Sequence, residues 1–344
     1  MIDRVRMGPA CYHVLHVLPP MTAHEMNFFV DEGLVDGAGR RAYELLPGGI
    51  APFNAEKIAL AQSMKEKGAT IAMDVKPSTV MYLNRRGANL RIVAGWRNQQ
   101  PNWVMGTPDI KDLAALRGRL VGLKDYGNIR YYALAYWLKE AGLEPRQDVR
   151  FIRGVSDGAT ALREGKVEAA FVPVNEGPAL RDEGFNLLID LSKQYPKGRP
   201  DRIIVATEEL IQQRPEWVSA LVKGMIRAYW FMRIMPENFR YLSNLERRMR
   251  MQSFDPEEQT IPLSCRTPAH CEEMPFPIDG MPSNFEDYLQ EWIDLGELEQ
   301  TDADCLEQSL RLDITKAAFD ELAARPELQD ELTRAREVAG RIGF

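Results

Sequence analysis

The chain has 344 residues, and its 43 Lys and Arg against 50 Asp and Glu give a formal net charge of −7. This length is too great for one ordinary core and fits two α/β lobes. No basic tract stands out, which argues against nucleic acid as a partner. No apolar run approaches the ~20 residues that a membrane-spanning helix needs.

The N-terminal segment shows no secretory leader. Residues 1–25 lack a basic stretch followed by a long apolar core and a small-residue cleavage site. Two localisations follow: the protein is cytoplasmic if Met1 is the native start, and periplasmic if a leader was removed.

The four cysteines, Cys11, Cys265, Cys271 and Cys305, show no metal-ligand spacing. Cys265 and Cys271 flank a loop that contains His270, where a zinc site or a disulfide is conceivable. Unpaired thiols are the simpler interpretation, and we expect neither a metal nor a cofactor.

Strands and helices alternate over the first hundred residues. The pattern predicts strands at 4–10, 42–47, 69–75 and 90–96, and helices at 22–33 and 54–68. Asn54 is the expected N-cap of the second helix and Gly68 its end. Such alternation predicts a parallel sheet with helices on its faces.

A second alternating series follows. It predicts helices at 109–118, 130–142 and 157–165, and strands at 119–123, 148–154, 167–174 and 185–191. A strand within 201–210 could return to the first lobe. Two crossings would then join the lobes, near residues 96–107 and 195–205.

The remainder of the chain is helical. A long helix is expected at 214–235, and further helices from Asn284 to the end, interrupted by a Pro-rich irregular loop at 261–282. This tail could cover a cleft between the lobes or form a homodimer contact.

Several segments resemble one known family in the same order along the chain: residues 23–34, 109–123, 136–154, 158–180 and 214–229. They are similar to the nitrate, sulfonate and taurine type of ABC-transporter substrate-binding proteins, which includes the thiamine-pyrimidine-precursor synthases. The resemblance covers roughly residues 4–235. The cysteine-rich motif of the synthases is missing, which counts against thiamine-pyrimidine synthesis.

The resemblance implies a type II periplasmic-binding-protein fold: two α/β lobes, a two-strand hinge and a ligand in the cleft. We assign residues 1–100 and 200–344 to lobe I, which includes a helical extension from about residue 236. Residues 101–199 form lobe II.

The loop between the strand at 119–123 and the helix at 130–142 is a candidate ligand site. In open parallel sheets, ligands bind beyond the carboxyl ends of the strands. Gly127 would let the backbone approach an anion at the helix start, and Arg130 could clamp a carboxylate, sulfonate or phosphate. Tyr126 and Asn128 share this loop. Alternatively, Asn128 is a plain N-cap and Arg130 is solvated.

Other strand ends should converge on the same cleft. They contribute Cys11, Tyr12, His13, Asp74, Lys76, Ser78, Arg153, Asn175 and Glu176. Trp96 and Trp103 flank the first crossing, where an aromatic ligand could stack on them, although tryptophan is more often packed core.

Cys11 and His13 are the catalytic candidates. The resemblance extends to a desulfinase on the same fold, whose essential cysteine occupies the loop of Cys11. A reactive thiolate needs a lowered pKa, which His13 could supply. A decarboxylase would instead use Lys76, Arg130 or Arg153 as an anchor. An inert buried cysteine is the competing interpretation.

Two main functions therefore remain open, and whether the protein is an enzyme is undecided. The first is a receptor that captures a small anionic or aromatic carboxylate or sulfonate between the lobes and delivers it to an ABC-transporter permease. The alternative is a cytoplasmic lyase or hydrolase acting on an aromatic acid, similar to a decarboxylase or desulfinase. A third possibility is a cytoplasmic ligand sensor that passes closure of the lobes to a partner.

Overall fold

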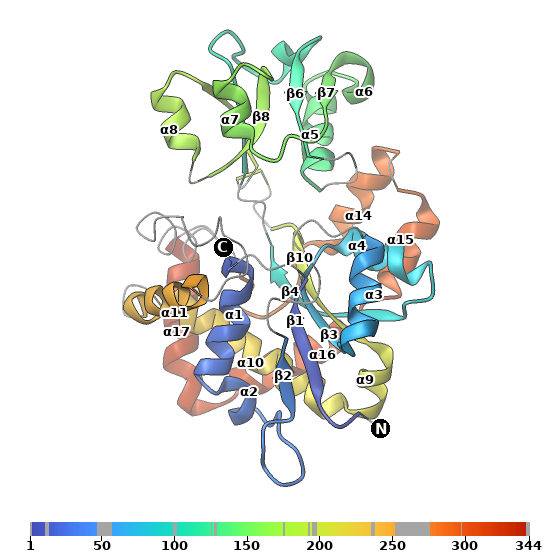
Figure 1. The fold of residues 1–344 in the computed structure, drawn as a ribbon, viewed down its shortest axis with the longest axis vertical. Coiled ribbons are helices and arrows are strands. Elements are labelled where there is room, and N and C mark those ends of the chain that lie inside the picture. The colour runs from blue at the N-terminus through green and yellow to red at the C-terminus, as the bar shows by residue number, and fades with distance from the viewer. Residues whose placement is uncertain are drawn as a thin grey trace. The chain divides into compact units, whose positions relative to one another are not determined.

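The computed structural model describes residues 2–10, 14–46, 57–98, 102–124, 126, 129–174, 176–191, 193–194, 198–234, 238–251, 276–296 and 298–341. The chain divides into two compact units (Figure 1). Unit 1 holds Met1–Asn98, Pro200–Asn284 and Gln300–Phe344, and unit 2 holds Gln99–Arg199 and Phe285–Glu299. The sequence-based division gave all residues after 200 to the first lobe, but Phe285–Glu299 pack in unit 2. The chain thus passes between the units at two points beyond the two crossings expected.

The sheet of unit 1 is mostly parallel. Its strands are β1 (Val5–Pro9), β2 (Tyr43–Leu45), β3 (Ile71–Val75), β4 (Leu90–Arg97) and β10 (Arg202–Thr207), in the order β2-β1-β3-β10-β4. β10 returns from the second series, as predicted, but pairs antiparallel with both β3 and β4.

The sheet of unit 2 has the order β7-β6-β8-β5-β9. It consists of β5 (Asn102–Gly106), β6 (Leu120–Gly122), β7 (Arg150–Ile152), β8 (Ala169–Pro173) and β9 (Asn186–Asp190). β5 is antiparallel to β8 and β9. The sequence analysis treated the residues of β5 as part of a crossing, but all five are buried in the sheet.

The helices of unit 1 are α1 (Val14–Glu25), α2 (Phe28–Asp31), α3 (Lys57–Lys67), α4 (Pro77–Asn84), α9 (Glu208–Gln213), α10 (Pro215–Arg233), α11 (Phe239–Met251), α15 (Gln300–Glu307), α16 (Leu312–Ala323) and α17 (Gln329–Arg341). Those of unit 2 are α5 (Ile129–Glu140), α6 (Pro145–Asp148), α7 (Gly158–Arg163), α8 (Gly177–Asp182) and α14 (Phe285–Asp294). Every helix in the described ranges is too short or too polar to span a membrane.

Two predicted helices differ from those observed. The helix expected at 22–33 begins at Val14 and is interrupted at Asn27, whose φ of 59° lies in the left-handed region. The helix expected at 109–118 is reduced to a 3₁₀ turn at Ala114–Leu116. The proposed cap Asn54 lies outside the described residues, while Gly68 has the left-handed φ of +60° expected after a helix end.

Helix α10 is the centre of unit 1. It packs against α1, α2, α16 and α17, and its buried side chains extend from Trp217 to Arg233. Tyr229 donates a hydrogen bond to the carbonyl oxygen of Gly95 in β4, 3.1 Å away. The C-terminal helices thus complete the core of unit 1.

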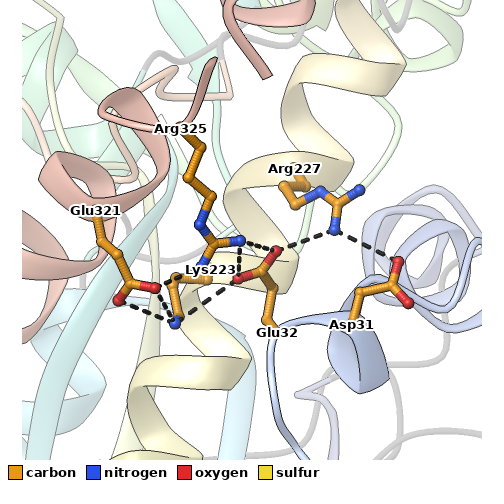
Figure 2. A network of polar contacts seen from close by, with 6 residues as sticks. All are labelled: Asp31, Glu32, Lys223, Arg227, Glu321 and Arg325. Carbon is orange, nitrogen blue, oxygen red and sulfur yellow. Dashed lines mark hydrogen bonds and ion pairs between the residues drawn. The ribbon is translucent and has the colours of Figure 1, made fainter. Parts of the chain in front are cut away.

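Ion pairs reinforce this packing (Figure 2). The side chain of Glu32 is fully buried and lies 3.0 Å from Arg227 and 2.9 Å from Arg325. Lys223 is 3.7 Å from Glu32 and 2.9 Å from Glu321. This network, completed by Asp31, joins α2 and α10 to the C-terminal region.

Gly158 allows α7 to approach β8 closely. A Cβ atom there would overlap the carbonyl oxygen of Phe171, a backbone atom that cannot move aside cheaply. We expect Gly158→Ala to lower the free energy of unfolding by about 1–3 kcal/mol through overpacking. Urea unfolding followed by circular dichroism measures this loss.

Gly37→Ala is the matched control, since nothing lies within 4 Å of a Cβ atom at that position. We expect it to change the free energy of unfolding by less than about 1 kcal/mol. Equal unfolding midpoints for the two variants would contradict the close approach of α7 to β8.

Candidate functional site

Unit 2 contains a pocket at the carboxyl ends of its parallel strands. The lining side chains come from the loop after β6, the start of α5, the loop after β7, and β8: Leu123, Lys124, Arg130, Tyr131, Ser156 and Phe171. This is the edge of the sheet at which ligands bind in open α/β folds.

Backbone hydrogen bonds hold together the two loops that form the pocket. The N–H of Leu123 donates to the carbonyl of Ile152 at 2.9 Å, and the N–H of Val155 donates to the carbonyl of Leu123 at 3.1 Å. A Cβ atom at Gly122 would lie only 3.1 Å from Val155. Glycine at this position therefore lets the loop after β7 lie directly against β6.

An aromatic cluster lies at the start of α5. The ring of Tyr126 meets Tyr131 and Phe151 edge to face, with centroids 5.1 and 5.9 Å apart. Arg146 donates from Nε to the hydroxyl of Tyr131 at 3.1 Å, and the guanidinium carbon of Arg153 lies 5.9 Å from the centre of the Tyr126 ring. These contacts fix Tyr126 beside the pocket.

Cationic side chains lie at and near this pocket. Lys124 and Arg130 line it, and the exposed Arg153 follows β7. Asp157 comes next after Ser156, but it accepts a hydrogen bond from the N–H of Thr160 at 2.9 Å as the N-cap of α7. Cationic side chains beside an apolar floor suit an anion that carries an apolar group.

Of the predicted site residues of unit 2, Arg130 lines the pocket, while Tyr126 lies between the pocket residue Tyr131 and Arg153. Trp103 is instead part of the hydrophobic core, where it packs against Gly177. Glu176 is half-buried at the N-cap position of α8. The predicted residues Gly127, Asn128 and Asn175 lie outside the described residues.

In unit 1, the predicted site residues are largely buried. Trp96 is 1% exposed and belongs to the hydrophobic core, so the packed-core interpretation describes both tryptophans. Ser78 is buried in the first turn of α4, next to Lys76 at its N-cap position. The catalytic candidates Cys11 and His13, and their neighbour Tyr12, lie outside the described residues, as does the loop of Cys265 and Cys271. Cys305 is a free, half-buried thiol.

Asp74 belongs to a buried ion-pair cluster that sequence reasoning missed. It has a left-handed φ of 60° and lies 3.4 Å from Arg202. Arg202 also pairs with Asp201 at 2.6 Å, and Asp201 accepts from Nε of Arg97 at 2.7 Å. The sequence did contain a sign of this cluster. Arg97 ends β4 and Arg202 begins β10, while the rest of both strands is largely apolar.

The cluster lowers the pKa of Asp201. Burial alone would raise it, but the neighbouring charges of Arg202 and Arg97 outweigh that cost. Burial and the nearby Asp74 together raise the pKa of Tyr229 well above its ordinary value. Asp201 therefore stays ionised as a structural partner of the two arginines.

The sequence matches the model of the family described as NMT1/THI5 like over residues 51–239. No curated protein matches it. Among solved structures, the periplasmic nitrate-binding protein NrtA from Synechocystis PCC 6803 has a TM-score of 0.64 at 15% identity, covering 96% of this chain and 91% of its own.

Two further solved structures are similar. The alkanesulfonate-binding protein SsuA from Xanthomonas axonopodis pv. citri, bound to MOPS, has a TM-score of 0.59 at 12% identity and covers 90% of this chain and 98% of its own. A variant of the desulfurization enzyme DSZB, in complex with biphenyl-2-sulfinic acid, reaches 0.57 at 14% identity, with coverages of 93% and 100%. At these identities the likeness shows the fold, and the predicted two-lobed α/β class is confirmed.

Proposed function

Because the chain belongs to the NMT1/THI5-like family, whose model matches more than half of it, we propose that it is the solute receptor of an ABC importer. Its ligand is a small organic anion, a carboxylate or sulfonate attached to an apolar group. Its partner is the importer's permease, and its place of action is the periplasm. Two of the similar structures are named for binding anions, nitrate and alkanesulfonates.

The observation that carries this proposal is the pocket of unit 2. Arg130 supplies a guanidinium that can form two parallel hydrogen bonds to a carboxylate or sulfonate. Lys124 adds a second positive charge, and Phe171 lines the same pocket with an apolar surface. An inorganic anion such as nitrate would leave that apolar surface unused, which favours an organic acid.

A ligand screen tests the proposal. We expect alkanesulfonates or aromatic carboxylates to raise the melting temperature, and the best of them to be recovered unchanged after incubation. Arg130→Gln should weaken its binding about tenfold to a hundredfold in calorimetric titration, because a charge-assisted hydrogen bond contributes about 1.5–3 kcal/mol.

The matched control is Lys166→Gln, which removes an exposed charge of unit 2 that pairs with the adjacent, exposed Glu164. It should leave the affinity unchanged. Equal affinity of the Arg130→Gln variant and the unaltered protein would refute the assignment of this pocket. If the protein consumed the ligand and the Cys11→Ser variant did not, the receptor assignment would be wrong and the protein would be an enzyme.

A further inference from the structure

We propose that α14 is a hinge-restraining helix, which together with the tether before it holds both principal crossings of the chain and limits the relative motion of the two units. This inference does not depend on the identity of the ligand. It rests on the tethers of α14, its packing in unit 2, and its contact with the second crossing.

The tether before α14 has almost no slack. Asn98, the last residue of unit 1 before the first crossing, donates from Nδ2 to the carbonyl of Met281 at 2.8 Å and to the hydroxyl of Ser283 at 2.5 Å. The N–H of Gly95 also donates to the carbonyl of Gly280 at 2.7 Å. Only Asn284 separates these anchors from α14, and one residue spans at most ~3.6 Å.

The tether after α14 is equally short. The N–H of Leu298 donates to the carbonyl of Trp292 at 3.2 Å, so the chain is still attached to α14 two residues before α15. α15 belongs to unit 1, where Asp302 pairs with Arg85 of α4. Five residues separate α14 from α15, but only Glu299 lies between the hydrogen-bonded Leu298 and α15. Each tether therefore leaves about one residue of free chain.

Aromatic side chains dock α14 in unit 2. The ring centroids of Trp292 and Tyr132 of α5 lie 4.0 Å apart, and Tyr288 packs 4.8 Å from Trp292. Phe285 is also buried. Tyr132 follows directly after the pocket residues Arg130 and Tyr131 in α5, so α14 supports the helix that carries them.

The second crossing is held by an ion pair. Arg199 is the last residue of unit 2 before the chain returns to unit 1, and it is 2% exposed. Its Nη1 atom lies 2.8 Å from Glu291 of α14, and its guanidinium carbon lies 5.2 Å from the ring centre of Tyr288. α14 thus holds the second crossing directly, while its preceding tether is bonded to the first.

The test loosens α14 without removing it. Gly/Ser segments of about eight residues, each adding about 15 Å of reach, are inserted after Asn284 and after Glu299 in the full chain. Genetically encoded spin labels at the exposed Lys65 of unit 1 and Lys166 of unit 2 report the distance between the units without ligand. We expect the distance distribution to become about twofold wider.

The same two insertions placed in the exposed turn around Gly37 and Gly39 should leave the width unchanged. Glu291→Gln, which keeps the size of the side chain but removes its charge, should widen the distribution by a smaller amount. An unchanged width with loosened tethers, or equal widening in the control, would overturn the proposal. Because no ligand is added, this result is independent of the ligand screen.

Discussion

Replacing Glu32 with Ala should lower the free energy of unfolding by about 3–5 kcal/mol. The carboxylate is fully buried and lies within 4 Å of Lys223, Arg227 and Arg325 (Figure 2). Its removal leaves three cations in the interior with too little negative charge to balance them. Urea unfolding followed by circular dichroism gives the free energy directly.

The neighbouring Asp31 provides the control. Its side chain is 50% exposed and lies 3.5 Å from Arg227, so Asp31→Asn should cost no more than about 1 kcal/mol. Glu32→Gln keeps the shape of the side chain and isolates the effect of its charge. If Asp31→Asn and Glu32→Ala were equally destabilising, the burial of Glu32 would not be the cause.

Asp201→Ala should produce a loss of similar size, about 3–5 kcal/mol, because it leaves Arg97 and Arg202 buried without this shared carboxylate. Asp201 is 3% exposed and joins the end of β4 to the start of β10. As a control, Asp313→Asn breaks an exposed pair with Arg311 and should cost no more than about 1 kcal/mol.

This stabilisation should depend on pH in a defined direction. The pKa of Asp201 lies below its ordinary value of 3.8 in the folded protein. Its contribution is therefore fully present above the unfolded pKa and is lost as the pH falls through the lower folded pKa. The stability difference between the unaltered protein and Asp201→Asn should shrink below about pH 4. A difference that stays constant down to pH 2 would contradict this sign.

Local sequence patterns predicted most elements of the fold. They failed where pairing between distant segments determines the direction of a strand. Apolar runs located β3, β4 and β8, and a helical period located α10. The early start of α1 was missed because Pro19 and Pro20 lie inside it, and proline normally disfavours a helix interior. The antiparallel direction of β5 and β10 depends on how the chain passes between the units, which no local pattern encodes.

The candidate site was predicted only in part, because several of its contacts join residues that are distant in sequence. A general rule about strand ends was enough to find Tyr126 and Arg130. Asp74 pairs with Arg202, which is distant in sequence. Because this partner could not be foreseen, Asp74 was predicted to contact a ligand. Trp96 and Trp103 lie near a crossing in sequence, but their rings point into cores, which sequence position alone does not reveal.

The late position of α14 in the chain has a consequence for biosynthesis. A ribosome has made every strand of unit 2 by Asp190, yet the helix that covers Tyr132 and neutralises Arg199 emerges only with residues 285–294. The nascent chain must keep this aromatic surface from aggregating through that interval. We therefore expect unit 2 to be completed only after residues 285–299 have been synthesised.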